Sequence, residues 1–422
     1  MKQRHTSSLD IDESSTTNIS LHNNVNDVDG TNVDPSPLLS SSSDLGRQLS
    51  TGDTCDDGGI DTTNNDVHPP CPPTWRHPMQ SSKTYFVELS HYFGWEFLSW
   101  LAINQCFVSG GVFALVSALG LPLFKELGID AARQQLYMSL IMSPWAMKPF
   151  IGVASDLVPV RGYNKRYFAL YSILIGLIGC SVLLGMYPNA SSVDQAKEDG
   201  TVQNLADIIV LCFTAVSYEA ATLDILGEGK YAELMRLHPG SGSSIISFKF
   251  GWSLLGGIFT QAYVGPLSDA GYFHVLFWMS LALSLTPFYP TFAGWIPEKL
   301  RTVSEPGMIK LCKGFLFDRG SFLEKKSPFI VITLCGLSAP LLAALTTYCD
   351  LAIGLSFAIA LIVMFTFATY KIFPRSFFWI FLSIVLNSMS WISIGSALGY
   401  YYTANEECVP NGKYCGLSYP FL

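Results

Sequence analysis

Residues Phe97–Phe124 read FLSWLAINQCFVSGGVFALVSALGLPLF and contain no Asp, Glu, Lys, Arg or His. A helix that crosses the hydrocarbon core of a bilayer needs about 20 predominantly apolar residues, and buried helices of soluble proteins are usually shorter. This stretch therefore predicts a transmembrane helix. Several more runs are free of charge or nearly so: Tyr167–Val193, Phe250–Ser268, Tyr272–Pro297, Ser327–Cys349, Leu351–Tyr370 and Ser376–Asn405.

The composition of the chain supports the same class of protein. Hydrophobic residues make up 49% and charged residues 14%, whereas soluble domains carry about 25% charged residues. Residues 1–82 hold 12 of the 33 acidic residues and four of the 25 basic ones. They are rich in Ser, Thr, Asn and Asp, so we expect an acidic, disordered, cytosolic tail. The remaining chain is balanced in charge, which argues against a nucleic-acid-binding surface.

The pattern predicts an all-α polytopic membrane protein with about nine transmembrane helices. Residues 83–296 would form a six-helix bundle, 297–327 a basic cytosolic linker, and 328–422 a partial bundle of three helices with an outside tail. The second half is therefore expected to be incomplete. The helices are expected at 98–121, 134–153, 167–187, 205–226, 245–267, 272–295, 328–347, 351–370 and 376–402.

Basic residues gather in three gaps that would share one face of the membrane. Because short loops rich in Lys and Arg stay in the cytosol, this distribution predicts a cytosolic N-terminus in a multi-pass protein. The linker 297–327 contributes seven bases against four acids. The other two gaps contain Arg161, Lys165 and Arg166, and Lys371 and Arg375.

Two features fall on the predicted outside face. Asn189-Ala190-Ser191 is a glycosylation sequon, although a chance tripeptide would look the same. Cys408 and Cys415 flank a Pro-Asn-Gly turn. A disulfide would be stable in that compartment, and two free thiols are the alternative.

The segment Ser143–Arg166, SPWAMKPFIGVASDLVPVRGYNKR, has the most specific pattern in the chain. Pro144 and Pro149 each remove a helical hydrogen bond, which predicts a kink near the inner end of the second helix. A carboxylate at a mobile helix end can form an ion pair in one state and release it in another. The alternative is simple anchoring by bases around a solvated Asp. The candidate gating loop consists of Gly152, Asp156, Arg161, Gly162, Lys165 and Arg166.

A few polar residues within the expected helices are candidates for contacts with a substrate or a proton. Glu219 lies about 12 Å from the expected inner end of its helix, where a charge is costly unless it is paired, protonated or hydrated. It is a candidate for proton binding or for recognition of an N–H donor, and a protonated Glu bonded to a neighbouring helix is the alternative.

Lys148, Asp224 and Lys249 lie nearer the inner face on three different helices. They are expected either to form a gating network or to bind substrate carboxylates, and snorkelling of the lysines to the interface is the alternative. Asn104, Gln105 and Gln261 are neutral candidates for a cavity lining. Hydrogen bonds between helices are the commoner role for such residues.

The gating loop is similar to the Gly-x-x-x-Asp…Arg-Gly-x-x-Lys-Arg loop of major facilitators. The wider chain resembles the folate–biopterin transporter family, and its kinetoplastid branch in particular. Where that family commonly has a second Asp, this chain has Glu228, four residues after Asp224. The other matching segments are Pro144-Trp145, Lys148-Pro149, Gly152, Ser155-Asp156, Pro159, Gly162-Tyr163, Asp224–Pro239, Gly251-Trp252 and Gly256-Gly257.

This resemblance implies a major facilitator-like bundle that imports folate or pteridines such as biopterin by alternating access, driven by protons. Its partners would be the substrate, protons and the lipid bilayer, without nucleic acid, and the plasma membrane is the default location for an uptake carrier. A carrier of another small organic solute, or a non-transporting receptor or regulatory form, is the alternative. No enzyme is expected, because the sequence contains no nucleophile–base constellation, metal-ligand cluster or cofactor loop. No cofactor is expected either.

Overall fold

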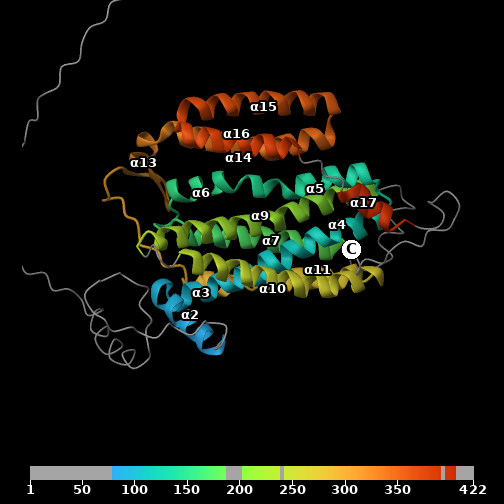
Figure 1. Ribbon diagram of the computed structural model, residues 1–422, viewed down its shortest axis with the longest axis horizontal. Helices are drawn as coiled ribbons and strands as arrows, with labels where there is room; N and C mark the ends of the chain where they lie inside the picture. Colours follow the sequence, from blue (N-terminus) through green and yellow to red (C-terminus); the bar gives the residue numbers. More distant parts are fainter. Residues whose placement is uncertain (1–77, 187–201, 238–241, 391–394, 405–422) are drawn as a thin grey trace, which may run out of the picture. The chain divides into compact units, whose positions relative to one another are not determined.

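The apolar runs form helices that lie side by side (Figure 1). The computed structural model describes residues 78–186, 202–237, 242–390 and 395–404. All of these residues belong to one unit of the chain, His77–Leu422. The acidic segment 1–77, the sequon at Asn189 and the cysteines Cys408 and Cys415 lie outside the described residues.

The first part of the described chain is entirely helical. Its helices are α2 (Pro78–Phe93), α3 (Trp95–Ile103), the π-helix η2 (Asn104–Phe113), α4 (Ala114–Glu126), α5 (Ala131–Ala146), α6 (Lys148–Leu157), α7 (Arg166–Met186), α9 (Val202–Met235), α10 (Gly242–Asp269), α11 (Phe273–Leu285) and α12 (Phe288–Ala293).

The second part starts with a short β-hairpin and continues as helices. Helix α14 packs against α5 and α6, and α15 packs against α14. In Figure 1 these later helices are orange to red. The elements are β1 (Met308–Cys312), β2 (Phe315–Asp318), α13 (Arg319–Glu324), α14 (Lys326–Tyr348), α15 (Leu351–Ile372), α16 (Arg375–Ser390) and α17 (Gly395–Tyr402).

This architecture confirms the predicted fold class, an all-α polytopic membrane protein. Six described helical segments are long and apolar enough to cross a membrane. The other three predicted crossings correspond to α5 with α6, to α10, and to α16 with α17. The six segments are Trp95–Glu126, Arg166–Met186, Val202–Met235, Phe273–Ala293, Lys326–Tyr348 and Leu351–Ile372.

The second expected helix is interrupted where the two prolines predict it. Helix α5 ends at Ala146, Met147 caps it, and α6 begins at Lys148. Pro149 lies in the first turn of α6, where its missing N–H leaves no hydrogen bond unmade. Trp145 and Lys148 lie on either side of this break: Trp145 lines the cavity described below, and Lys148 belongs to the charged cluster beside it.

Helix α9 is the central element of the bundle. It was expected to end at 226 but continues to Met235, so Asp224 and Glu228 belong to one uninterrupted helix. It packs against α5, α6, α7 and η2. In its most apolar window 67% of the residues are buried, against 6% in α15. A bilayer would supply the apolar surroundings that α15 lacks within the protein.

The expected basic linker has structure of its own. Strands β1 and β2 pair antiparallel, with Met308 opposite Asp318. The hairpin is joined to residues 158–165 by backbone hydrogen bonds from Arg161 N to Gly314 O (2.6 Å) and from Leu316 N to Pro159 O (3.0 Å). Two of the three basic gaps therefore meet. We call this region, residues 158–165 with residues 298–325, the basic end of the bundle.

Two glycines allow η2 and α10 to approach until their backbones touch. A Cβ atom added at Gly256 would lie 2.0 Å from the carbonyl oxygen of Cys106, and one at Gly110 would lie 2.3 Å from that of Ser253. Real Cβ atoms do not approach oxygen so closely, so these positions require glycine. Small residues commonly permit such packing between helices in membranes. This contact sets the distance between two walls of the site.

We predict that Gly256→Ala lowers the thermal unfolding temperature of the detergent-purified protein. The added methyl group would force η2 and α10 apart, and overpacking of this kind costs about 1–3 kcal/mol. Gly251→Ala is the matched control, because nothing lies within 4 Å of its added Cβ and alanine favours a helix. Equal unfolding temperatures for the two variants would contradict the close contact.

Candidate functional site

A cavity that is open on one side lies between η2, α4, α5 and α10, and two of its lining residues, Phe250 and Leu254, are exposed. Its volume is about 640 Å³, within the range of about 300–1,000 Å³ that is typical of small-molecule sites. Most of its lining is apolar or aromatic, with a few hydroxyl and amide groups. The lining residues are Ser109, Gly110, Phe113, Ala114, Ser117, Trp145, Phe250, Ser253, Leu254, Gly257 and Gln261.

Trp145 forms the wall of this cavity on the α5 side. Its ring lies 4.5 Å from that of Phe113, centroid to centroid. The Lys148 Nζ lies 3.8 Å from the centroid of the Trp145 ring, a cation–π contact. The indole N–H of Trp145 is buried and has no hydrogen-bond partner in the described part of the protein. The tryptophan thus connects the cavity to a charged group.

A cluster of charged side chains, centred on Asp224, adjoins the cavity. Lys148 and Lys249 both form ion pairs with the Asp224 carboxylate, the second at 3.0 Å. Gln105 Nε2 donates to Asp224 Oδ1 at 2.8 Å, and Lys249 also pairs with Glu228. Two ammonium groups thus balance two carboxylates. The structure brings together four sequence candidates, Gln105 of η2, Lys148 of α6, Asp224 of α9 and Lys249 of α10.

The cluster lies on the side of the cavity that faces the basic end. Helices α5 and α6 run toward residues 158–165, so Lys148 is nearer the basic end than Trp145. Helix α10 starts near the basic end and runs away from it (Figure 1), so Lys249 is nearer than most of the α10 residues in the cavity wall. The charged cluster therefore separates the cavity from the loops of that end.

Glu219 has a different environment from Asp224. Five residues separate the two on α9, which rotates them by about 140° around the helix axis. Glu219 is fully buried, and its Oε2 accepts a hydrogen bond from Ser284 Oγ on α11 at 2.9 Å. The carboxyl group lies against Gly176 on α7, where an added Cβ would meet it at 1.9 Å. Glu219 is not among the residues that line the cavity.

The neutral candidates also occupy separate places. Gln261 lines the cavity, whereas Gln105 belongs to the charged cluster. Asn104 is buried, and neither polar atom of its side chain has a hydrogen-bond partner in the described residues. Buried amides are rarely left without partners. Asn104 therefore differs in its hydrogen bonding from Gln105, its neighbour in the sequence, which donates to Asp224.

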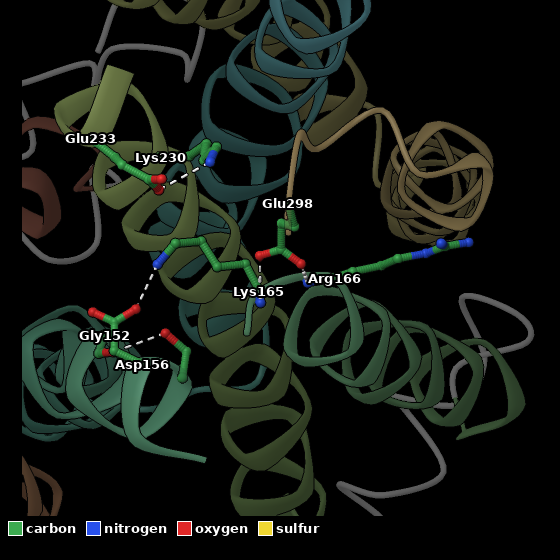
Figure 2. Close-up of polar contacts among 8 residues, drawn as sticks. Gly152, Asp156, Lys165, Arg166, Lys230, Glu233 and Glu298 are labelled. Atoms are coloured by element: carbon green, nitrogen blue, oxygen red, sulfur yellow. Dashed lines mark hydrogen bonds and ion pairs between the residues drawn. The ribbon is translucent and has the colours of Figure 1, made fainter. Parts of the chain in front are cut away.

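The candidate gating loop forms a chain of polar contacts at the basic end, shown in Figure 2. Lys165 Nζ lies 2.8 Å from Asp156 Oδ1, and the lysine chain passes over Gly229 of α9. The Gly152 carbonyl accepts a hydrogen bond from Ser155 Oγ at 2.8 Å. Because the Asp156 side chain is 62% exposed, solvent weakens this ion pair. A weak pair of this kind can exchange partners.

Glu298, which was not among the sequence candidates, holds the start of α7. Its carboxylate accepts hydrogen bonds from the backbone N–H groups of Lys165 (2.7 Å) and Arg166 (3.2 Å). Burial raises the pKa of Glu298, and these two bonds oppose the rise. A carboxylate at a helix N-terminus satisfies donors that the helix leaves unpaired. An isolated acid after a proline gave no sequence signal for this long-range role.

The same loop turns tightly before α7 and is held by two further contacts. Arg161 and Gly162 both have positive φ angles, +51° and +84°, so two residues that turn the chain tightly precede α7. The Gly162 carbonyl accepts a hydrogen bond from Arg301 N at 2.8 Å. The Arg166 guanidinium donates to the carbonyl of Phe292. The loop is thus tied to the segment that follows α12.

Comparison with known proteins gives several partial matches. A folate-biopterin transporter of Synechocystis sp. is 30% identical over 176 residues, which are 42% of this chain and 32% of that protein. Probable folate-biopterin transporter 6 of Arabidopsis thaliana is 29% identical over 111 residues, 26% of this chain and 21% of that protein. The chain thus matches about a third or less of the length of these relatives.

The match to a family is more extensive. No solved structure matches the chain. Residues 114–404, which include the charged residues Lys148, Asp224, Glu228 and Lys249, match the BT1 family. Because this match covers more than half of the sequence, the chain belongs to the BT1 family.

Proposed function

We propose that this protein is a membrane transporter that imports folate, or pteridines such as biopterin, by alternating access coupled to protons. The observation that carries the proposal is the cavity beside Trp145, with the charged cluster of Asp224 between it and the basic end. Membership of the BT1 family and the names of the relatives support the substrate class.

The chemistry of the cavity suits a planar heteroaromatic ring. The cavity lining includes the aromatic rings of Trp145, Phe113 and Phe250. Stacking of a planar ligand ring on such side chains is favourable. Ser109, Ser253 and Gln261 supply hydroxyl and amide groups, which can bond the amine and ring N–H groups of a pterin. The cavity volume leaves room for a ligand of this size.

The charged cluster is proposed as a gate on the side of the basic end. Alternating access requires contacts that form in one state and break in the other. Ion pairs from Asp224 to two lysines join α9 to α6 and to α10, so their exchange would free these helices. Lys148 or Lys249 could then bind the glutamate carboxylates of a folate, and Asp224 or Glu228 could accept a proton.

The orientation is proposed from the charge pattern, and the plasma membrane is proposed as the default location of an uptake carrier. We propose a multi-pass protein of the plasma membrane with its N-terminus and its basic end in the cytosol, because loops rich in Lys and Arg stay on that side. The contacts between residues 158–165 and the hairpin support a common side for two of the basic gaps. Residues 83–296 would then form the bundle that holds the cavity.

The test of the proposal is uptake of radiolabelled folate and biopterin by folate-auxotrophic cells that express this chain, with and without a proton uncoupler. We expect concentrative uptake that the uncoupler abolishes. Uptake that an uncoupler leaves unchanged would contradict proton coupling alone. Absence of uptake, with the protein present at the cell surface, would contradict transport and favour a receptor. Competition by unlabelled solutes would identify another cargo.

We predict that Asp224→Asn reduces uptake at least tenfold and lowers the stability of the purified protein. Without this carboxylate Lys148 and Lys249 lose their shared partner, and breaking a buried ion pair from one side costs about 3–5 kcal/mol. Adding Lys148→Gln removes one of the stranded charges, so the double variant should recover part of the stability. Lys371→Gln, an exposed base, is the control. Additive losses in the double variant would contradict a coupled cluster.

We predict that Glu219→Gln leaves the uptake rate and its pH profile unchanged. A carboxylate ion with a single hydroxyl donor is costly at this depth, so we expect a protonated Glu219, which glutamine resembles in shape and bonding. Glu219→Leu should instead lower thermal stability, because Ser284 then loses its acceptor. An altered pH profile in Glu219→Gln would assign proton coupling to this residue rather than to Asp224 and Glu228.

A further inference from the structure

The segment that follows α12 presents an excess of positive charge. Its exposed bases have no acidic partner among the described residues. The exception in the segment is Arg301, which lies 3.4 Å from Glu305 and 3.6 Å from Asp318. The exposed bases without a partner are Lys299, Lys310, Lys313, Arg319, Lys325 and Lys326.

The acids of this segment are mostly engaged within the protein. Glu298 holds the start of α7. Asp318 caps α13, accepting hydrogen bonds from the N–H (2.9 Å) and the hydroxyl (2.8 Å) of Ser321. Glu305 faces Arg301, which leaves Glu324 as the acid without a described partner. Because these acids bind other groups of the protein, they do not neutralise the exposed bases, and the outer surface of the segment is positive.

Apolar side chains are interleaved with these bases. Ile309 and Leu311 alternate with Lys310 along β1, and Leu311 is 63% exposed. Leu300 and Leu323 are exposed as well. Because successive side chains of a strand point to opposite faces, Lys310 and Ile309 lie on opposite faces of β1, and both are exposed in the described residues. Segments that lie at a membrane surface combine exposed bases with exposed apolar side chains.

The position of the segment brings this surface to the level of the lipid headgroups. Trp295 packs against Trp95 (5.6 Å between ring centroids) and against Tyr289 (6.1 Å). Trp and Tyr are enriched at the membrane–water interface, so these rings mark that level. Lys299 follows Trp295 by four residues, and α14, a candidate span, begins at Lys326. Both ends of the segment are therefore held near the membrane, where the field of anionic lipids is felt.

We propose that residues 299–326 form a docking surface for anionic phospholipid headgroups of the adjacent leaflet, with the bases binding phosphate and the apolar side chains inserted between lipids. This interaction does not depend on the identity of the transported solute. The hairpin is bonded to Arg161 through Gly314 and to Pro159 through Leu316. Bound lipid would therefore brace the candidate gating loop.

The test uses the full chain, purified in detergent, with phosphatidylglycerol and phosphatidylcholine as probes and native mass spectrometry to count bound lipids. We expect a preference for phosphatidylglycerol. The variant Lys299→Gln/Lys310→Gln/Lys313→Gln should lose this preference, by about fivefold in affinity for each charge removed. The matched control, with the same three lysines changed to arginine, keeps the charges and should bind as the unaltered chain does. Thermal unfolding of both variants checks that the fold is intact.

Three results would overturn the proposal. Equal binding of the two lipids would show that headgroup charge is not recognised. Equal loss in the Gln and Arg variants would show that the lysines act through shape rather than charge. Full competition by glycerol phosphate at the concentration of the lipid would assign the surface to soluble anions instead of the membrane.

Discussion

The high cost of an unpaired charge inside a membrane is the constraint on which this structure depends. The charge of Asp224 is compensated by ion pairs with Lys148 and Lys249 and by a hydrogen bond from Gln105, and these three residues come from three neighbouring helical segments. Each partner must reach the same carboxylate, so the rotations of α6, α9, α10 and η2 about their axes are set together. The carboxylate that would destabilise one isolated helix thereby specifies the packing of four.

Close backbone packing complements this polar constraint. Gly110 and Gly256 let η2 and α10 touch, and the same two segments supply the lining of the cavity on both sides of the contact. On either side of the break at Met147, Trp145 lines the cavity and Lys148 pairs with Asp224. One short stretch of the chain, residues 145–148, thus contains both a packing contact of the cavity, from Trp145, and an ion pair of the cluster, from Lys148.

The basic end combines several weak contacts. The Asp156–Lys165 pair, whose carboxylate is exposed, adds little stability. The bonds from Glu298 to the start of α7 and the backbone bond between Arg161 and Gly314 are less dependent on solvent. The ion pair of Asp156 can therefore exchange while the backbone contacts keep the loop in place. A weak pair beside a firmly tied loop fits the gating role that is proposed for this loop.

Sequence patterns alone determined the membrane class, the approximate helix positions and the interruption near Pro144 and Pro149, because helix length, hydropathy and proline chemistry are local properties. They also singled out Lys148, Asp224 and Lys249 as candidates. Local patterns could not show that these side chains meet at one carboxylate, that Glu219 turns away from the cavity, or that Glu298 holds α7. Those facts depend on how each helix is rotated and on contacts between residues far apart in the chain, which only the tertiary structure decides.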